Sequence, residues 1–390
     1  MRLAHISDCH LGFGRRGMRF AEQDVYRCFQ TAMSEARQWA DVILVTGDLF
    51  DNVRLDVDAL RLAASEFSAC KQPVVIVGGN HDVPAMVGVE SPLSMLKEMC
   101  PSIHLAEREY QRFDVSGLEI HAVPARYLAR WTEWIEPDSK WSVLAIHGVH
   151  AYSPMRPPGD AWLIPQLYDA SRFRYVALGD LHDWHSLPTR YPPREYYAGS
   201  TAYCSSNIWS EQSPKGWLKV TIGTLLNVQF VRIKQRGWLT VELDLDSLES
   251  DPLIELEMRL NSALIEKLTT GAIHREPPVL RVIIRSADLN RLNQVESSIR
   301  AQKLPVSALY VVRRYRNFIV RHHIAQGDLR TRWINYVSSR LNELPKGVDA
   351  QEVIRRGLEA LELNGDFNDA LRVLVHLPDD DPDPILSGTS

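Results

Sequence analysis

Short apolar runs and longer amphipathic stretches alternate through the first 200 residues of the chain. Runs of about four to eight Val, Ile, Leu or Ala residues are typical of buried strands, whereas apolar residues that recur every three or four positions are typical of helices. The runs predict strands at residues 3–7, 42–46, 74–77, 143–146 and 175–178, and the amphipathic stretches predict helices at 21–39 and 56–70. Strands that alternate with helices indicate a layered α/β core.

The pattern changes near residue 196. The later elements are predicted to be strands at 216–222, 226–233 and 239–245, a helix at 252–268, a strand at 279–285, a helix at 289–302 and a strand at 308–314. Helical stripes follow at 351–361 and 367–376, before an acidic, proline-rich end that we expect to be disordered. We therefore expect a catalytic domain over 1–235, an α+β cap over 236–326, a helical segment over 327–377 and a tail over 378–390.

Five polar clusters occupy the ends of predicted strands. They are Asp8-Cys9-His10, Gly47-Asp48, Gly79-Asn80-His81-Asp82, His147-Gly148 and Gly179-Asp180-Leu181-His182. The carboxyl ends of parallel strands meet at one edge of a sheet, where open α/β folds build their sites. Any one cluster can occur by chance, but five in order indicate a two-metal phosphoester-cleaving site.

The residue types suit two ions that share one carboxylate. Asp48 can be the bridge, because its two oxygens can reach both ions. Asp8 and His10 can hold one ion, and Asn80 and His147 can hold the other. Asp180 and His182 repeat the spacing of two, so the fifth cluster can serve both ions.

The ordered motifs D-x-H, G-D, G-N-H-D, H-G and G-[HD]-x-H resemble those of the calcineurin-like metallophosphoesterase superfamily over roughly residues 1–200. Segments 6–12, 47–51 and 176–179 are similar to the SbcD branch, the double-strand-break repair nucleases. This resemblance implies an α-β-β-α sandwich. It also implies that Mn²⁺, or Mg²⁺, is held by two sets of ligands: Asp8, His10, Asp48 and His182 for one ion, and Asp48, Asn80, His147 and Asp180 for the other.

The same resemblance implies that His81 lies beside the scissile phosphate and protonates the leaving group, with Asp51 in a supporting catalytic role. One departure concerns Asp180, where the superfamily normally has His. A carboxylate there favours Mn²⁺ or Mg²⁺ over Zn²⁺. Three other residues could take the place of Asp180 as a ligand. They are Asp183 and His185, which lie close to it in the sequence, and His150.

Composition changes the picture in one region. The formal net charge is −5, but residues 271–345 hold twelve Arg and one Lys against five acidic residues, a net of +8. This segregation suits a polyanionic partner. The five cysteines are widely spaced, which indicates reduced thiols, and no apolar run approaches the roughly 18 residues of a membrane span, so we expect a cytoplasmic protein.

Three functions fit these observations. The first is a metal-dependent DNA repair nuclease, for which the resemblance implies a homodimer and a partner ATPase of the SbcC coiled-coil kind. The second is a phosphatase or cyclic-nucleotide phosphodiesterase acting on small molecules with the same metal core. The third is a scaffold subunit without turnover. The choice between endonuclease and exonuclease activity stays open.

Overall fold

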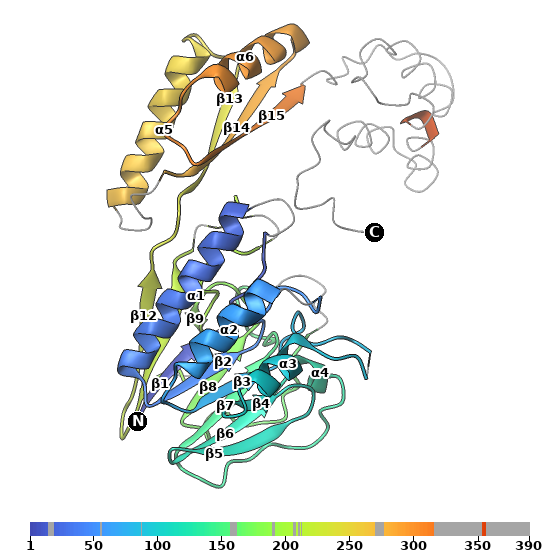
Figure 1. The fold of residues 1–390 in the computed structure, drawn as a ribbon, viewed down its shortest axis with the longest axis vertical. Coiled ribbons are helices and arrows are strands. Elements are labelled where there is room, and N and C mark those ends of the chain that lie inside the picture. The colour runs from blue at the N-terminus through green and yellow to red at the C-terminus, as the bar shows by residue number, and fades with distance from the viewer. Residues whose placement is uncertain are drawn as a thin grey trace. The chain divides into compact units, whose positions relative to one another are not determined.

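The computed structural model describes residues 1–14, 19–54, 57–86, 88–156, 162–188, 192–205, 208–209, 211, 213–269, 277–315 and 353–355. The predicted helical segment, apart from 353–355, and the predicted tail lie outside these residues. The chain divides into two compact units, the first comprising Met1–Arg236 and the second beginning at Gly237. Both units are drawn in Figure 1.

The first unit contains a six-stranded sheet in the order β12-β11-β1-β2-β3-β4. Its strands are β1 (Arg2–Ile6), β2 (Val42–Thr46), β3 (Val74–Val77), β4 (His104–Ala106), β11 (Lys215–Ile222) and β12 (Leu226–Ile233). Strands β1 to β4 are parallel, and β11 joins the free side of β1 in antiparallel orientation. The carboxyl ends of β1, β2 and β3 therefore lie at one edge of the sheet.

Three helices follow strands of this sheet: α1 (Arg19–Trp39), α2 (Val57–Ser68) and α3 (Pro92–Met99). Helix α1 packs against β1, β11 and β12, and α2 packs against α1 (Figure 1). The start of α3 is fixed by sequence: Ser91 caps it by accepting a hydrogen bond from Ser94 N, and Pro92 follows at the first helical position.

A second six-stranded sheet has the order β5-β6-β7-β8-β10-β9. Its strands are β5 (Gln111–Val115), β6 (Leu118–Val123), β7 (Ser142–His147), β8 (Tyr175–Gly179), β9 (His185–Ser186) and β10 (Glu195–Tyr197). Strands β6, β7, β8 and β10 are parallel, so β7 and β8 end at the same edge.

The two sheets pack face to face over a shared apolar core. Leu3, Val42 and Leu44 of the first sheet are fully buried in one cluster with Val143 and Ala177 of the second. The outer face of the second sheet is covered by α4 (Ala125–Leu128) and by irregular segments that bury a second cluster of apolar side chains. The layered α/β core expected from sequence is confirmed.

The second unit has the order β13 (Trp238–Asp244), α5 (Pro252–Thr269), β14 (Val279–Ser286), α6 (Leu289–Ala301) and β15 (Ala308–Tyr315). Its three strands are all parallel. The predicted elements are present, but the α+β description is wrong for them, because a helix connects each pair of strands and turns the chain back into a parallel register. No helix in the described ranges has the length and apolar character needed to cross a membrane.

Candidate metal centre

The side chains of the five polar clusters meet at the edge where β1, β2, β3, β7 and β8 end. Asp8, His10, Asp48 and Asp180 all have positive φ angles, between 47° and 98°. This left-handed region is costly for residues other than glycine and is found mostly where function requires it. The backbone therefore turns sharply after β1, β2 and β8, at residues that carry candidate ligands.

Glycine is required beside these ligands because the strands approach each other closely. A Cβ atom on Gly47 would lie 2.0 Å from Nδ1 of His147, and one on Gly179 would lie 1.9 Å from the carbonyl oxygen of Thr46. The glycines of the G-D and G-D-x-H motifs thus allow ligands from the two sheets to come together.

Two histidines, one from each sheet, define the first half of the centre. The Nε2 atoms of His10 and His182 lie 3.0 Å apart, so both imidazoles point at the same space. Oδ2 of Asp48 lies 3.9 Å from Nε2 of His10. A carboxylate oxygen of Asp8 lies within 4.8 Å of ligand atoms of both residues. These four residues are the set expected to hold one ion.

The second half forms around His147. Its Nε2 atom lies 3.0 Å from Oδ1 of Asn80, 3.4 Å from Oδ2 of Asp48 and 3.5 Å from Oδ1 of Asp180. Its Nδ1 donates to the carbonyl oxygen of Thr46 at 2.8 Å, which leaves Nε2 as a ligand atom. Asp180 therefore lies with the residues of its predicted set.

Asp48 stands between the two halves. The same oxygen, Oδ2, faces Nε2 of both His10 and His147, while Oδ1 accepts a hydrogen bond from the backbone N–H of His81 at 2.9 Å. Only 2% of Asp48 is exposed. A carboxylate in this position can touch both ions of a binuclear centre.

The electrostatics of the cluster fit bound cations. Burial would lower the pKa of His147, but Asp48 and Asp180 outweigh it and hold that pKa well above its ordinary value. Burial also opposes the charged form of His10, yet Asp51 and Asp48 raise its pKa to about 9. These carboxylates thus favour positive charge in the space between them. Oxygen with imidazole donors suits divalent ions such as Mn²⁺.

His81 and Asp51 lie together beside the first half of the centre. Nδ1 of His81 donates to the carbonyl oxygen of Asp51 at 2.8 Å, and the exposed His81 ring lies edge-on to His10 with centroids 5.0 Å apart. The Asp51 carboxylate lies 3.3 Å from Nδ1 of His10. Asp51 therefore contacts His81 through its backbone and His10 through its side chain.

The alternative ligands near Asp180 have other partners. Asp183 lies 3.4 Å from Nζ of Lys215, and His185 contacts Ser153 and the backbone of Asp183. His150 lies 3.8 Å from Glu195. Among the described residues, none of the three belongs to a group that could hold an ion.

Sequence reasoning missed several residues that support the centre. Asp82, fully buried, accepts hydrogen bonds from the backbone N–H groups of Leu49, Phe50 and Gly79, and so joins the loops of two clusters. Asp82 is the last residue of the Gly79-Asn80-His81-Asp82 cluster, so the sequence indicated that it lies near the site. The sequence did not indicate that it binds backbone N–H groups. Arg126 donates to the carbonyl oxygens of Asn80 and Val83, and only the folded structure reveals it.

The thiols agree with the expectation of reduced cysteines. All five are free, and four of them are buried. Cys204 lies beside the centre, with Sγ 3.8 Å from Nδ1 of His182. Burial raises its pKa well above the ordinary value, so the uncharged thiol form is favoured there.

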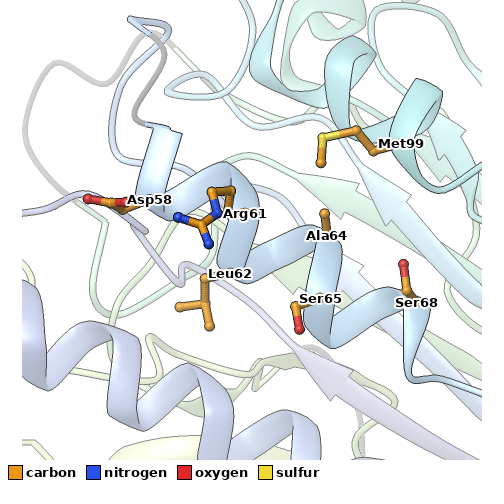
Figure 2. A pocket seen from close by; sticks show the side chains of 7 residues that line it. All are labelled: Asp58, Arg61, Leu62, Ala64, Ser65, Ser68 and Met99. Carbon is orange, nitrogen blue, oxygen red and sulfur yellow. The ribbon is translucent and has the colours of Figure 1, made fainter.

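A separate hollow of about 590 Å³ lies on the outer side of α2 (Figure 2). It is lined by six residues of α2 and by Met99 of α3, and it includes none of the candidate ligands. The hollow is open, and among the described residues no group of side chains that could hold an ion lies in it, so the metal centre is the candidate site.

Comparison with known proteins agrees with this geometry. A family model described as calcineurin-like phosphoesterase matches residues 1–218. The chain is 29% identical over 291 residues to the DNA double-strand break repair protein Mre11 of Methanopyrus kandleri, covering 68% of this chain and 59% of that protein. It is 25% identical over 369 residues to Mre11 of Sulfolobus acidocaldarius, covering 88% and 89%.

A shorter match involves a bacterial protein. The chain is 36% identical over 100 residues to the SbcD component of the SbcCD nuclease of Bacillus subtilis, which covers 24% of this chain and 25% of that protein. The chain thus spans about six-tenths of the Methanopyrus protein and a quarter of the Bacillus one.

Proposed function

Because the chain belongs to the calcineurin-like phosphoesterase family, we propose that its metal centre hydrolyses phosphodiester bonds of DNA in double-strand-break repair. The observation that carries this proposal is the place of Asp48, with one oxygen facing His10 and His147 at 3.9 and 3.4 Å. The names of the archaeal relatives support DNA as the substrate and repair as the setting. We also propose that the activity is cytoplasmic.

We propose that the ligands divide between two ions as the family resemblance implies. Asp8, His10, Asp48 and His182 would hold one ion, and Asp48, Asn80, His147 and Asp180 would hold the other, with Mn²⁺ as the expected metal and Mg²⁺ as its substitute. When bound, such a pair supplies a nucleophilic water at neutral pH and stabilises charge on the phosphate oxygens.

His81 is the residue of this chain that we assign to proton transfer. The Asp51 carbonyl holds Nδ1 of His81 as a donor. In the imidazolium form Nε2 then carries the second ring proton, which it can give to the leaving oxygen. Histidine exchanges protons readily near neutral pH, so it suits this role. Asp51 supports the step by orienting the ring, and its carboxylate also steadies His10.

We propose that the unit beginning at Gly237 acts as a cap that contacts DNA. The basic stretch of residues 271–345 supports this, although three of its described arginines, Arg285, Arg300 and Arg313, pair with Glu242 or Glu296. The basic residues that remain in excess can bind the negatively charged phosphates of the DNA backbone.

A cleavage assay tests the proposed function. Purified protein with Mn²⁺ should cut both labelled duplex and single-stranded DNA, and its binding to duplex DNA should weaken steeply with added salt, because phosphate contacts release counterions. End-labelled linear and circular substrates then separate exonuclease from endonuclease activity.

Bis(p-nitrophenyl) phosphate and a cyclic nucleotide serve as comparison substrates. Hydrolysis of these small esters without DNA binding or cleavage would contradict the proposal and favour the small-molecule phosphodiesterase instead. Absence of all turnover in protein that binds Mn²⁺ would favour the scaffold.

We further propose that the chain forms a homodimer and that residues 327–377 bind an SbcC-like coiled-coil ATPase. The similarity to one component of a nuclease named SbcCD supports such a partner. A chain shortened after Gly327 should lose at least about tenfold in affinity for the ATPase in a pull-down, while it keeps its Mn²⁺ content. Retention of the ATPase by the shortened chain would count against this assignment. The homodimer is tested separately by light scattering, which measures the mass of the protein in solution.

A further inference from the structure

Lys215, the first residue of β11, is a lysine inside the protein. Only 1% of the residue is exposed, and its side chain is completely inaccessible. An ammonium group taken out of water destabilises the fold unless partners compensate for its lost hydration. The contacts of Nζ therefore indicate the role of the buried charge.

Nζ of Lys215 has three polar partners, two of them hydrogen-bond acceptors and the third an ion-pair partner. It donates to the backbone carbonyl oxygen of His182 at 2.9 Å and lies 3.3 Å from Oε2 of Glu211 and 3.4 Å from Oδ1 of Asp183. The strongest geometry is thus with the backbone of a candidate metal ligand. The same carbonyl also accepts a hydrogen bond from Ser200 N at 3.0 Å.

The contact joins the two sheets at the metal centre. Lys215 belongs to β11, which pairs with β1, the strand that leads to Asp8 and His10. His182 follows β8 of the second sheet. For the Nε2 atoms of His10 and His182 to meet at 3.0 Å, the loop that carries His182 must be held against the first sheet. Lys215 supplies a hydrogen bond at this point.

We propose that Lys215 is a positioning residue for metal binding: through the carbonyl of His182 it holds that imidazole opposite His10 and so sets the affinity for the ion between them. The proposal rests on the two-ion centre of the proposed function and adds the residue that links the two sheets at the half formed by His10 and His182. Outer partners that orient a ligand commonly change metal affinity by about 10- to 100-fold.

Metal binding to the apo protein tests this role. Lys215→Met keeps the length of the side chain and removes its charge. We expect titration calorimetry with Mn²⁺ to show one ion bound with wild-type affinity and the other bound at least about tenfold more weakly. Electron paramagnetic resonance should then show isolated Mn²⁺ at a loading where the wild type shows coupled pairs.

Two further variants separate positioning from folding. Lys215→Met leaves Glu211 buried without its cation, so the double variant Lys215→Met/Glu211→Gln removes both charges and is the better folded form if the single variant unfolds. Lys219→Met is the matched control, because Lys219 lies on the same strand, stacks on Trp39 and Trp217, and should leave both affinities unchanged. Thermal melting of each apo protein reports stability separately.

The outcomes are distinct. Wild-type affinity for both ions in the Lys215 variants, with only the melting temperature reduced, would overturn the proposal and leave Lys215 a structural residue. Wild-type protein that binds two Mn²⁺ ions but does not cut DNA would contradict the nuclease function alone, and the affinities would still decide the role of Lys215.

Discussion

Replacing His81 with alanine is expected to lower the rate of DNA cleavage by about 10²- to 10⁴-fold, the usual contribution of a general acid. The variant should keep both ions, because the His81 ring is exposed and belongs to neither ligand set proposed here. The measurement is single-turnover cleavage of labelled duplex DNA at saturating Mn²⁺, with metal content determined on the same preparation.

The leaving group provides a sharper form of this test. A p-nitrophenyl phosphodiester releases a stable anion that needs no proton, so His81→Ala should impair its hydrolysis much less than that of DNA. Asp51→Ala is the contrast variant, since it keeps the carbonyl that orients His81 and removes the carboxylate near His10. Equal loss on both substrates, or loss of metal from His81→Ala, would refute the assignment of His81 as the acid.

The second large effect is expected at Asp48. Asp48→Ala removes the one oxygen that faces both His10 and His147, so the affinity for both ions should fall and activity should disappear. Asp180→Ala removes a carboxylate that lies beside His147, and we expect it to lose the ion of that half alone. Elemental analysis after dialysis against low Mn²⁺ should give two ions for the wild type, one for Asp180→Ala and fewer than one for Asp48→Ala.

Each variant can fail in its own way. Two ions retained by Asp180→Ala would show that Asp180 is no ligand. The presence of Asp180 in place of the family's usual His would then have no effect on metal binding. One ion retained at full affinity by Asp48→Ala would show that the carboxylate serves a single ion. Circular dichroism of the metal-free proteins is the control for folding in both cases.

The local elements of this fold follow from the sequence wherever apolar runs are clean. The strands predicted at 42–46, 74–77 and 226–233 coincide with β2, β3 and β12. Strand β6 was missed because it contains Glu119 and His121, which read as exposed positions. In the structure both are buried and contact each other, with Nε2 of His121 2.6 Å from Oε1 of Glu119.

The short strands were missed for a different reason. Strands β9 and β10 have two and three residues, too few to show a period of two. The pairing of β11 with β1 joins residues at opposite ends of the first unit, and no local pattern reveals such a register. Propensity therefore locates elements, whereas tertiary packing decides which of them are neighbours.

The candidate centre shows the same division. The clusters at strand ends could be identified because parallel strands bring their carboxyl ends to one edge. Residues that support them could not: Lys215 reads in sequence as an ordinary lysine at the start of a strand, and Asp82 as one more acidic side chain. Their roles depend on backbone atoms of distant loops, which side-chain patterns do not encode.

The place of β1 beside β11 has a consequence for how the protein is made. Leu3 pairs with Val220, so β1 is synthesised long before the strand that covers its second edge. Until then one edge of β1 has unpaired backbone N–H and C=O groups, which can pair with a strand of another chain. The loop bearing His182 lacks its lysine tether for the same interval. On the proposed role of Lys215, a nascent chain that ends before β11 contains every candidate ligand but lacks the residue that positions His182, so full metal affinity is expected only once β11 is made.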